Sequence, residues 1–79
     1  MLFQFDADGQ WGIWMKDMKF PIDILWADAS GAIVYIVSDA TPASYPTVFT
    51  PPLPARYVLE LPAGYLAAHK LKVGDTLAL

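Results

Sequence analysis

The side chains best suited to chemistry in this sequence are four charged groups near aromatic residues: Lys16, Asp17, Asp23 and Glu60. Trp14 precedes Lys16 by two positions, so in an extended strand both side chains would lie on the same face. Glu60 stands between two leucines, and a carboxylate shielded in this way needs a partner. Lys16 is the partner that the sequence offers.

This group suits more than one kind of site. Trp14, Lys16 and a carboxylate would bind a sugar-like ring or another small polar ligand, with Tyr45 and Phe49 from a later loop above them. The predicted ligand-binding residues are therefore Trp14, Lys16, Asp17, Glu60, Tyr45 and Phe49. Alternatively, Glu60 with Asp17 or Asp23 would form an acid–base pair of the kind used in glycoside hydrolysis.

Each residue also has a simpler interpretation. Lys16 and Glu60 would contribute little as an ion pair on an outer sheet face, and Asp23 would bond backbone amides at the start of a strand. Trp14 alternates out of register with Trp11, so we expect at least one tryptophan outside the core. Binding is the role that we expect first, ahead of catalysis.

Composition limits the remaining classes of function. The 79 residues predict one domain, residues 1–79, and the net charge of −3 without a basic run argues against nucleic acid as a partner. The hydrophobic fraction of 56% is high, so docking of an apolar face onto a protein partner, or a homo-oligomer, is a third hypothesis. There is no cysteine and His69 is the single histidine, so we expect no metal or cofactor.

The sequence carries no evident targeting signal. No run of 18 apolar residues predicts a transmembrane helix. The segment Met1 to Asp6 has no basic region typical of a signal peptide. The localisation therefore remains open.

Alternation of period two predicts a mostly β fold: a small antiparallel β-sandwich or partly open, jelly-roll-like barrel. The expected strands are residues 2–5, 11–16, 22–27, 32–38, 57–61 and 76–79. Two segments of the form Asp-x-x-Gly, residues 6–9 and 28–31, predict β-hairpin turns, and residues 73–75 predict a third turn.

Two further segments depart from the strand pattern. Residues 63–71 have the composition and spacing of one short helix near the C-terminus. Residues 40–55 hold five of the seven prolines, which excludes a central strand because proline lacks the backbone donor. We expect an ordered loop there, packed through its aromatic residues.

These segments together resemble a known family. The run Trp14-Met15-Lys16-Asp17, then Pro21-Ile22-Asp23, then Asp28-Ala29-Ser30-Gly31 resembles the family called domain of unknown function 192. Further matches follow in order at Pro42, Tyr57 to Leu61, Ala63-Gly64 and Gly74-Asp75.

The resemblance implies a small, mostly antiparallel β fold of the sandwich or jelly-roll kind, and it implies no activity. Many relatives carry signal peptides or lipoprotein leaders, which implies an extracytoplasmic role for those proteins. Two departures stand out: Asp17 replaces the usual Asn, and the family usually has about thirty more residues before the segment that begins at Met1. From the missing N-terminal segment we expect that the chain is a fragment of a longer protein.

Overall fold

The computed structural model describes residues 1–78, and it is mostly β. A four-stranded antiparallel sheet has the order β1-β6-β3-β4, with bounds β1 Leu2–Gly9, β3 Ile22–Ala27, β4 Ile33–Ala40 and β6 Ala55–Pro62. A second sheet pairs β2 Ile13–Trp14 with β5 Val48–Phe49. The helical elements are η1 Pro42–Ser44 and α1 Tyr65–Ala68. The expected fold class is confirmed: two antiparallel sheets that do not close into a barrel, and one short C-terminal helix.

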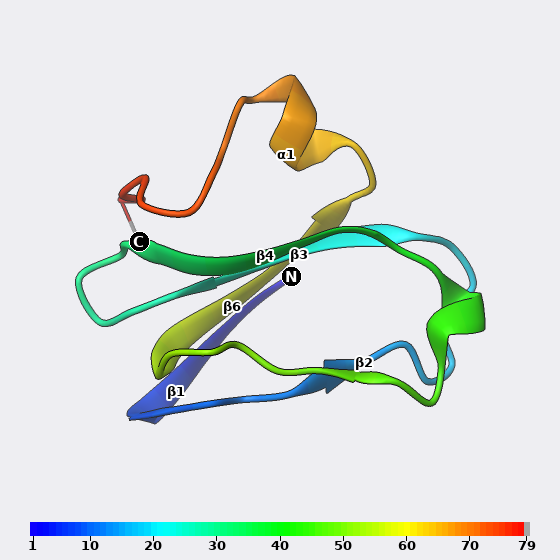
Figure 1. Ribbon diagram of the computed structural model, residues 1–79, viewed down its shortest axis with the longest axis horizontal. Helices are drawn as coiled ribbons and strands as arrows, with labels where there is room; N and C mark the ends of the chain where they lie inside the picture. The colour runs from blue at the N-terminus through cyan, green and yellow to red at the C-terminus, as the bar shows by residue number, and fades with distance from the viewer. Residues whose placement is uncertain (79) are drawn as a thin grey trace.

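Both faces of the large sheet are covered (Figure 1). The β2–β5 sheet lies against one face, and α1 with the C-terminal segment lies against the other. All six residues of β3 are buried as a consequence. Ile22, Ile24 and Trp26 join the core beneath β2–β5, while Leu25 and Ala27 join the core beneath Leu66 of α1. Because successive side chains of a strand point to opposite faces, β3 contributes residues to two separate cores.

Two tryptophans hold the first core to its surroundings. Trp26 is fully buried, and its indole nitrogen donates to the backbone carbonyl of Trp11 at 2.7 Å. The indole nitrogen of Trp11 donates in turn to the carbonyl of Ala55 at 3.1 Å, and its ring stacks on Phe5 with a centroid distance of 4.4 Å. A buried indole NH group needs a hydrogen-bond acceptor, and these two bonds offset the cost of removing the indole NH groups from water.

The hairpin predicted at residues 28–31 is confirmed. Asp28 Oδ1 accepts hydrogen bonds from the backbone NH groups of Ser30 at 2.9 Å and Ala32 at 3.1 Å. Gly31 has a φ of 87°, which only glycine adopts without strain. The turn predicted at residues 73–75 is also present, with a φ of 99° at Gly74.

The hairpin predicted at residues 6–9 is wrong. The segment continues β1 to Gly9, and β1 pairs with β6 instead of with the segment that follows it. Asp6, the residue predicted to cap the turn, lies within β1, and Asp8 accepts a hydrogen bond from Arg56 Nε on β6 at 2.9 Å. Residues of β6 thus provide the hydrogen-bond partners of this segment, in place of a tight turn.

Several predicted bounds change. The strand expected over residues 11–16 shortens to β2, and the helix expected over residues 63–71 shortens to the single turn α1. The strand expected at residues 76–79 is wrong in its described part, where Thr76 forms one isolated bridge with Ala32; Leu79 lies outside the described residues. None of the helices formed by residues 1–78 is long and apolar enough to cross a membrane.

The proline-rich segment is ordered, as expected, and it contains η1 and β5. Its position is held by long-range bonds, such as that from the Gln10 side-chain amide to the Pro51 carbonyl at 3.0 Å. Among residues 1–78, β5 pairs with β2 and with no strand of the large sheet, so the prolines on either side of it remove no bond from that sheet.

Candidate functional site

Three of the predicted site residues gather at the surface of the small sheet, and we call Trp14, Lys16 and Tyr45 the aromatic patch. The Trp14 and Tyr45 rings have a centroid distance of 5.3 Å and an interplanar angle of 49°. Lys16 Nζ lies 5.6 Å from the centroid of the Trp14 ring, within the range of a cation–π contact. Trp14 is 46% exposed and Tyr45 is 44% exposed, so both rings face solvent.

Alternation along β2 explains this placement. Met15 is buried in the first core, and Trp11 and Ile13 pack against that core. Trp14 and Lys16 share the opposite face, as the sequence predicted, and both are exposed. Tyr45 comes from the turn between η1 and β5, and the pairing of β5 with β2 brings it to Trp14.

Phe49 does not belong to the patch. It pairs with Ile13 across the small sheet, whereas Trp14 pairs with Val48. Because paired residues share a face, Phe49 points with Ile13 toward the core, and it packs against the buried cluster. Phe49 therefore does not meet Trp14 and Tyr45, although the sequence had led us to expect that it would.

Asp17 stands in the turn that ends this segment. The backbone NH of Met18 donates to the carbonyl of Met15 at 3.2 Å, and Asp17 has a φ of 62°. Its side chain is exposed and makes no hydrogen bond or ion pair with residues 1–78. The left-handed backbone, which Asn, Asp and Gly tolerate best, accounts for the residue type here.

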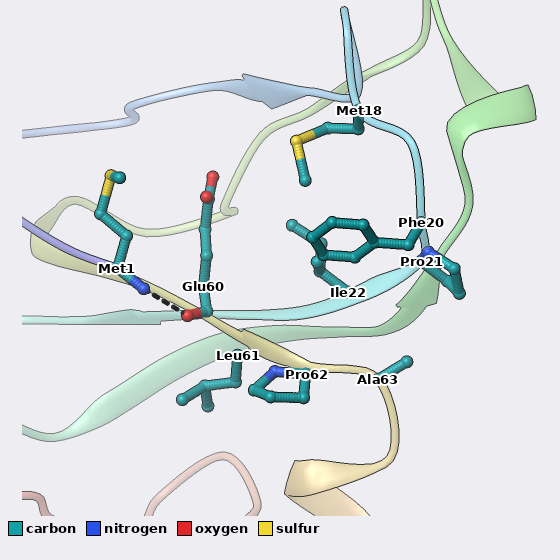
Figure 2. Close-up of a pocket in the computed structure, with 9 residues that line it drawn as sticks. All are labelled: Met1, Met18, Phe20, Pro21, Ile22, Glu60, Leu61, Pro62 and Ala63. Atoms are coloured by element: carbon teal, nitrogen blue, oxygen red, sulfur yellow. Dashed lines mark hydrogen bonds between the residues drawn. The ribbon is translucent and has the colours of Figure 1, made fainter.

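Glu60 lies elsewhere, in what we call the Glu60 pocket. This hollow of about 440 Å³ is lined by the end of β6, by Met1 and by the segment that leads into β3. In Figure 2 the Glu60 side chain stands between Met1 on one side and Met18 with Phe20 on the other, while Leu61 points away. Apart from Glu60, the side chains that line the hollow are apolar.

The predicted pairing of Lys16 with Glu60 is wrong. Among residues 1–78 the ion pairs are Arg56 with Asp8 and Lys72 with Asp75. Lys16 lies over the Trp14 ring instead, and it is not among the residues lining the Glu60 pocket.

Asp23 has a structural position. It is 1% exposed, and its two carboxylate oxygens accept the NH groups of Asp39 and Leu66, each at 2.9 Å. Burial acts to raise the pKa of Asp23, but the bonds from backbone NH groups outweigh burial and hold the pKa below its ordinary value. Asp23 pairs with Leu61 in the sheet and Glu60 pairs with Ile24, so the two acids occupy opposite faces and cannot share a proton.

Sequence reasoning missed the apolar residues of the Glu60 pocket, above all Met18 and Phe20. Phe20 is 61% exposed, and it directly precedes Pro21 in the short connection between β2 and β3. A large aromatic residue in such a connection was the available signal, because turns between strands seldom carry one without a contact to make. Within residues 1–78 no three acidic or histidine side chains gather as metal ligands would.

Comparison with known proteins identifies the family of the chain. The model of the family DUF192, described as "Uncharacterized ACR", matches residues 1–79. The chain belongs to the DUF192 family. The earlier resemblance is thereby confirmed over the full length of the chain. No curated protein matches the sequence.

Two solved structures share the fold of this DUF192 chain. One, from Sinorhizobium meliloti 1021, is described as a "putative transcription regulator"; it is 35% identical with a TM-score of 0.92, and the match covers 99% of this chain and 60% of that one. The other is a protein of unknown function from Novosphingobium aromaticivorans DSM 12444, 25% identical with a TM-score of 0.91, covering 100% and 56%. The chain thus spans less than two thirds of either solved protein.

Proposed function

We propose that this domain is a binding module that holds a small polar, sugar-like ligand on the aromatic patch. The observation that carries the proposal is the Trp14–Tyr45 pair: two half-exposed rings with a centroid distance of 5.3 Å, contributed by separate segments of the chain. Two large rings held side by side in solvent lack the burial that usually stabilises such side chains. A ligand that stacks on them would supply it.

The chemistry of the patch suits a ring with both apolar and hydroxyl surfaces. The aromatic faces would contact the C–H groups of the ligand, and the Lys16 ammonium has three donors for hydroxyl or carboxylate oxygens. Lys16 lies over the Trp14 ring and is exposed, so it can turn from the ring to a ligand without breaking an ion pair. Asp17 follows directly, and its exposed carboxylate would accept from ligand hydroxyls.

A catalytic role has less support. Acid–base catalysis by paired carboxylates needs both groups to reach one substrate. Asp23 accepts hydrogen bonds from backbone NH groups on the face of the sheet opposite Glu60. Asp17 does not line the pocket that holds Glu60. Contact with DNA, which the description of the Sinorhizobium protein raises, draws no support from a net charge of −3.

The test is a panel of monosaccharides, disaccharides and polyols, titrated while heteronuclear NMR follows the indole NH signals. Trp11 and Trp26 donate these groups to backbone carbonyls, so Trp14 should be the tryptophan that responds. Trp14→Ala should abolish binding, and Lys16→Gln should weaken it about tenfold, the ratio expected for one charged hydrogen bond.

Tyr65→Ala is the matched control, because Tyr65 is a partly exposed aromatic residue on α1 that stacks on His69 away from the patch. It should leave binding unchanged. A panel without any response at Trp14, or a Trp14→Ala variant that binds as tightly as the parent, would refute the proposal. Light scattering on the same sample tests the subunit hypothesis, since a monomer at low concentration excludes an obligate homo-oligomer.

A further inference from the structure

The Glu60 pocket combines an apolar wall with a single charge. Met18 and Phe20 face Glu60 from the connection before β3, and Met1 faces it from the start of β1 (Figure 2). The volume of about 440 Å³ lies within the range of small-molecule sites. The pocket is separate from the aromatic patch, because neither Trp14, Lys16 nor Tyr45 lines it.

Glu60 has no cationic partner among residues 1–78. Its side chain is partly buried, and no lysine, arginine, histidine or terminal ammonium of the described chain forms an ion pair with it. The nitrogen of Met1 donates at 2.6 Å to the backbone carbonyl of Glu60 and not to its carboxylate. A carboxylate against apolar groups, without a partner of its own, favours an external cation.

The walls favour the same kind of ligand. Phe20 is 61% exposed at the rim, where its ring can lie against a cation or against an apolar body. The two methionine side chains, Met1 and Met18, are flexible and adapt to ligands of different outline. The part of a ligand inside would thus be apolar, with its charge at Glu60.

We propose that the Glu60 pocket binds a small organic monocation: an ammonium group carried on an apolar body. The ammonium would donate to the Glu60 carboxylate, and the body would lie between Met18 and Phe20. This proposal does not depend on the function proposed for the aromatic patch, and an experiment can refute one of the two proposals without the other.

The probe is phenethylammonium, titrated into the protein while NMR follows the methyl signals of Met1 and Met18. The neutral analogue 2-phenylethanol and the anion 3-phenylpropionate are the control ligands, because each carries the same phenyl ring on a two-carbon chain with a different charge. Phenethylammonium should bind about tenfold more tightly than 2-phenylethanol, as expected for one charged hydrogen bond, and 3-phenylpropionate should bind least. The methyl signal of Met18 should shift, and the indole signal of Trp14 should not.

Glu60→Gln keeps the size of the side chain and removes its charge. It should lower the affinity for phenethylammonium about tenfold and leave that for 2-phenylethanol unchanged. Phe20→Ala should weaken both ligands. Asp39→Asn is the matched control: it removes one exposed negative charge outside the pocket, and Asn tolerates the φ of 55° at that position.

Equal binding of the ammonium and the alcohol would overturn the proposal. So would an affinity for phenethylammonium that Glu60→Gln and Asp39→Asn lower by the same factor, since that result would reflect net charge alone. Shifts confined to Trp14 would place the cation on the aromatic patch and would also contradict it.

Discussion

The backbone NH of Leu66 donates to Asp23 Oδ2 at 2.9 Å, and this bond joins the central strand β3 to α1 across 43 residues of sequence. The first NH groups of a helix have no partner within the helix, so a carboxylate at this position satisfies one of them. The other oxygen, Oδ1, accepts the NH of Asp39 at the end of β4. One buried side chain thus positions two elements that carry no site residue themselves.

Asp23→Asn should lower the free energy of unfolding by about 2–3 kcal/mol. An amide has one acceptor oxygen, so its NH₂ group would face one of the two backbone donors at Asp39 and Leu66. Urea denaturation measures the loss. Asp6→Asn, at an exposed position of β1, is the control and should change stability by less than about 0.5 kcal/mol. Equal effects of the two substitutions would contradict a structural role for Asp23.

Stability should fall at acid pH because of the same carboxylate. The pKa of Asp23 in the folded state is below its ordinary value of 3.8, so the unfolded chain binds the proton more tightly. The stabilisation is complete above the ordinary pKa and is lost as pH falls through the folded value.

Asp28 acts in the same direction. The Ser30 hydroxyl and backbone NH groups hold the pKa of Asp28 below its ordinary value against a smaller effect of burial. Thermal unfolding of the parent and of Asp23→Asn between about pH 2 and pH 7 measures the dependence. The variant should lose less stability on acidification than the parent; parallel curves would show that Asp23 does not contribute.

Asp17→Gly should raise the free energy of unfolding by about 0.5 kcal/mol, because glycine adopts the φ of 62° without a Cβ contact but loses more chain entropy on folding. Asp17→Asn should raise it less, and Asp17→Val should lower it by about 1–2 kcal/mol. Lys16→Gly is the control. Lys16 is not in the left-handed region, so that change should destabilise the protein, and a gain of stability there would undermine the explanation.

Gly31→Ala should be far more costly than Gly74→Ala. Both glycines have positive φ, at 87° and 99°, so both variants carry the strain of an L-residue in that region, about 1–2 kcal/mol. A Cβ at Gly31 would also collide with the backbone carbonyl oxygen of Leu77, whereas a Cβ at Gly74 meets no atom within 4 Å. The difference between the two losses, measured by chemical denaturation, isolates the collision; similar losses would mean that the C-terminal segment yields.

Much of the local structure could be predicted, because it depends on neighbours in the chain. The Asp28–Gly31 hairpin follows from a capping carboxylate and a glycine within four residues. The exposure of Trp14 and Lys16 opposite Met15 follows from the period of two. The turn predicted at Asp6 to Gly9 failed although its residues follow the same pattern, because Asp8 and its strand found partners on β6 instead.

The sequence by itself determined that the fold is mostly β, that Trp14 and Lys16 share a face opposite Met15, and which family the chain belongs to. Only the tertiary structure decided which of the candidate residues meet: Tyr45 reaches Trp14 through the β2–β5 pairing, and Glu60 goes to a pocket of its own. The physical reason is that alternation assigns a side chain to one face of its strand, but pairing between distant segments decides what that face meets. That pairing is chosen by burial summed over the whole chain, as in the two cores fed by β3.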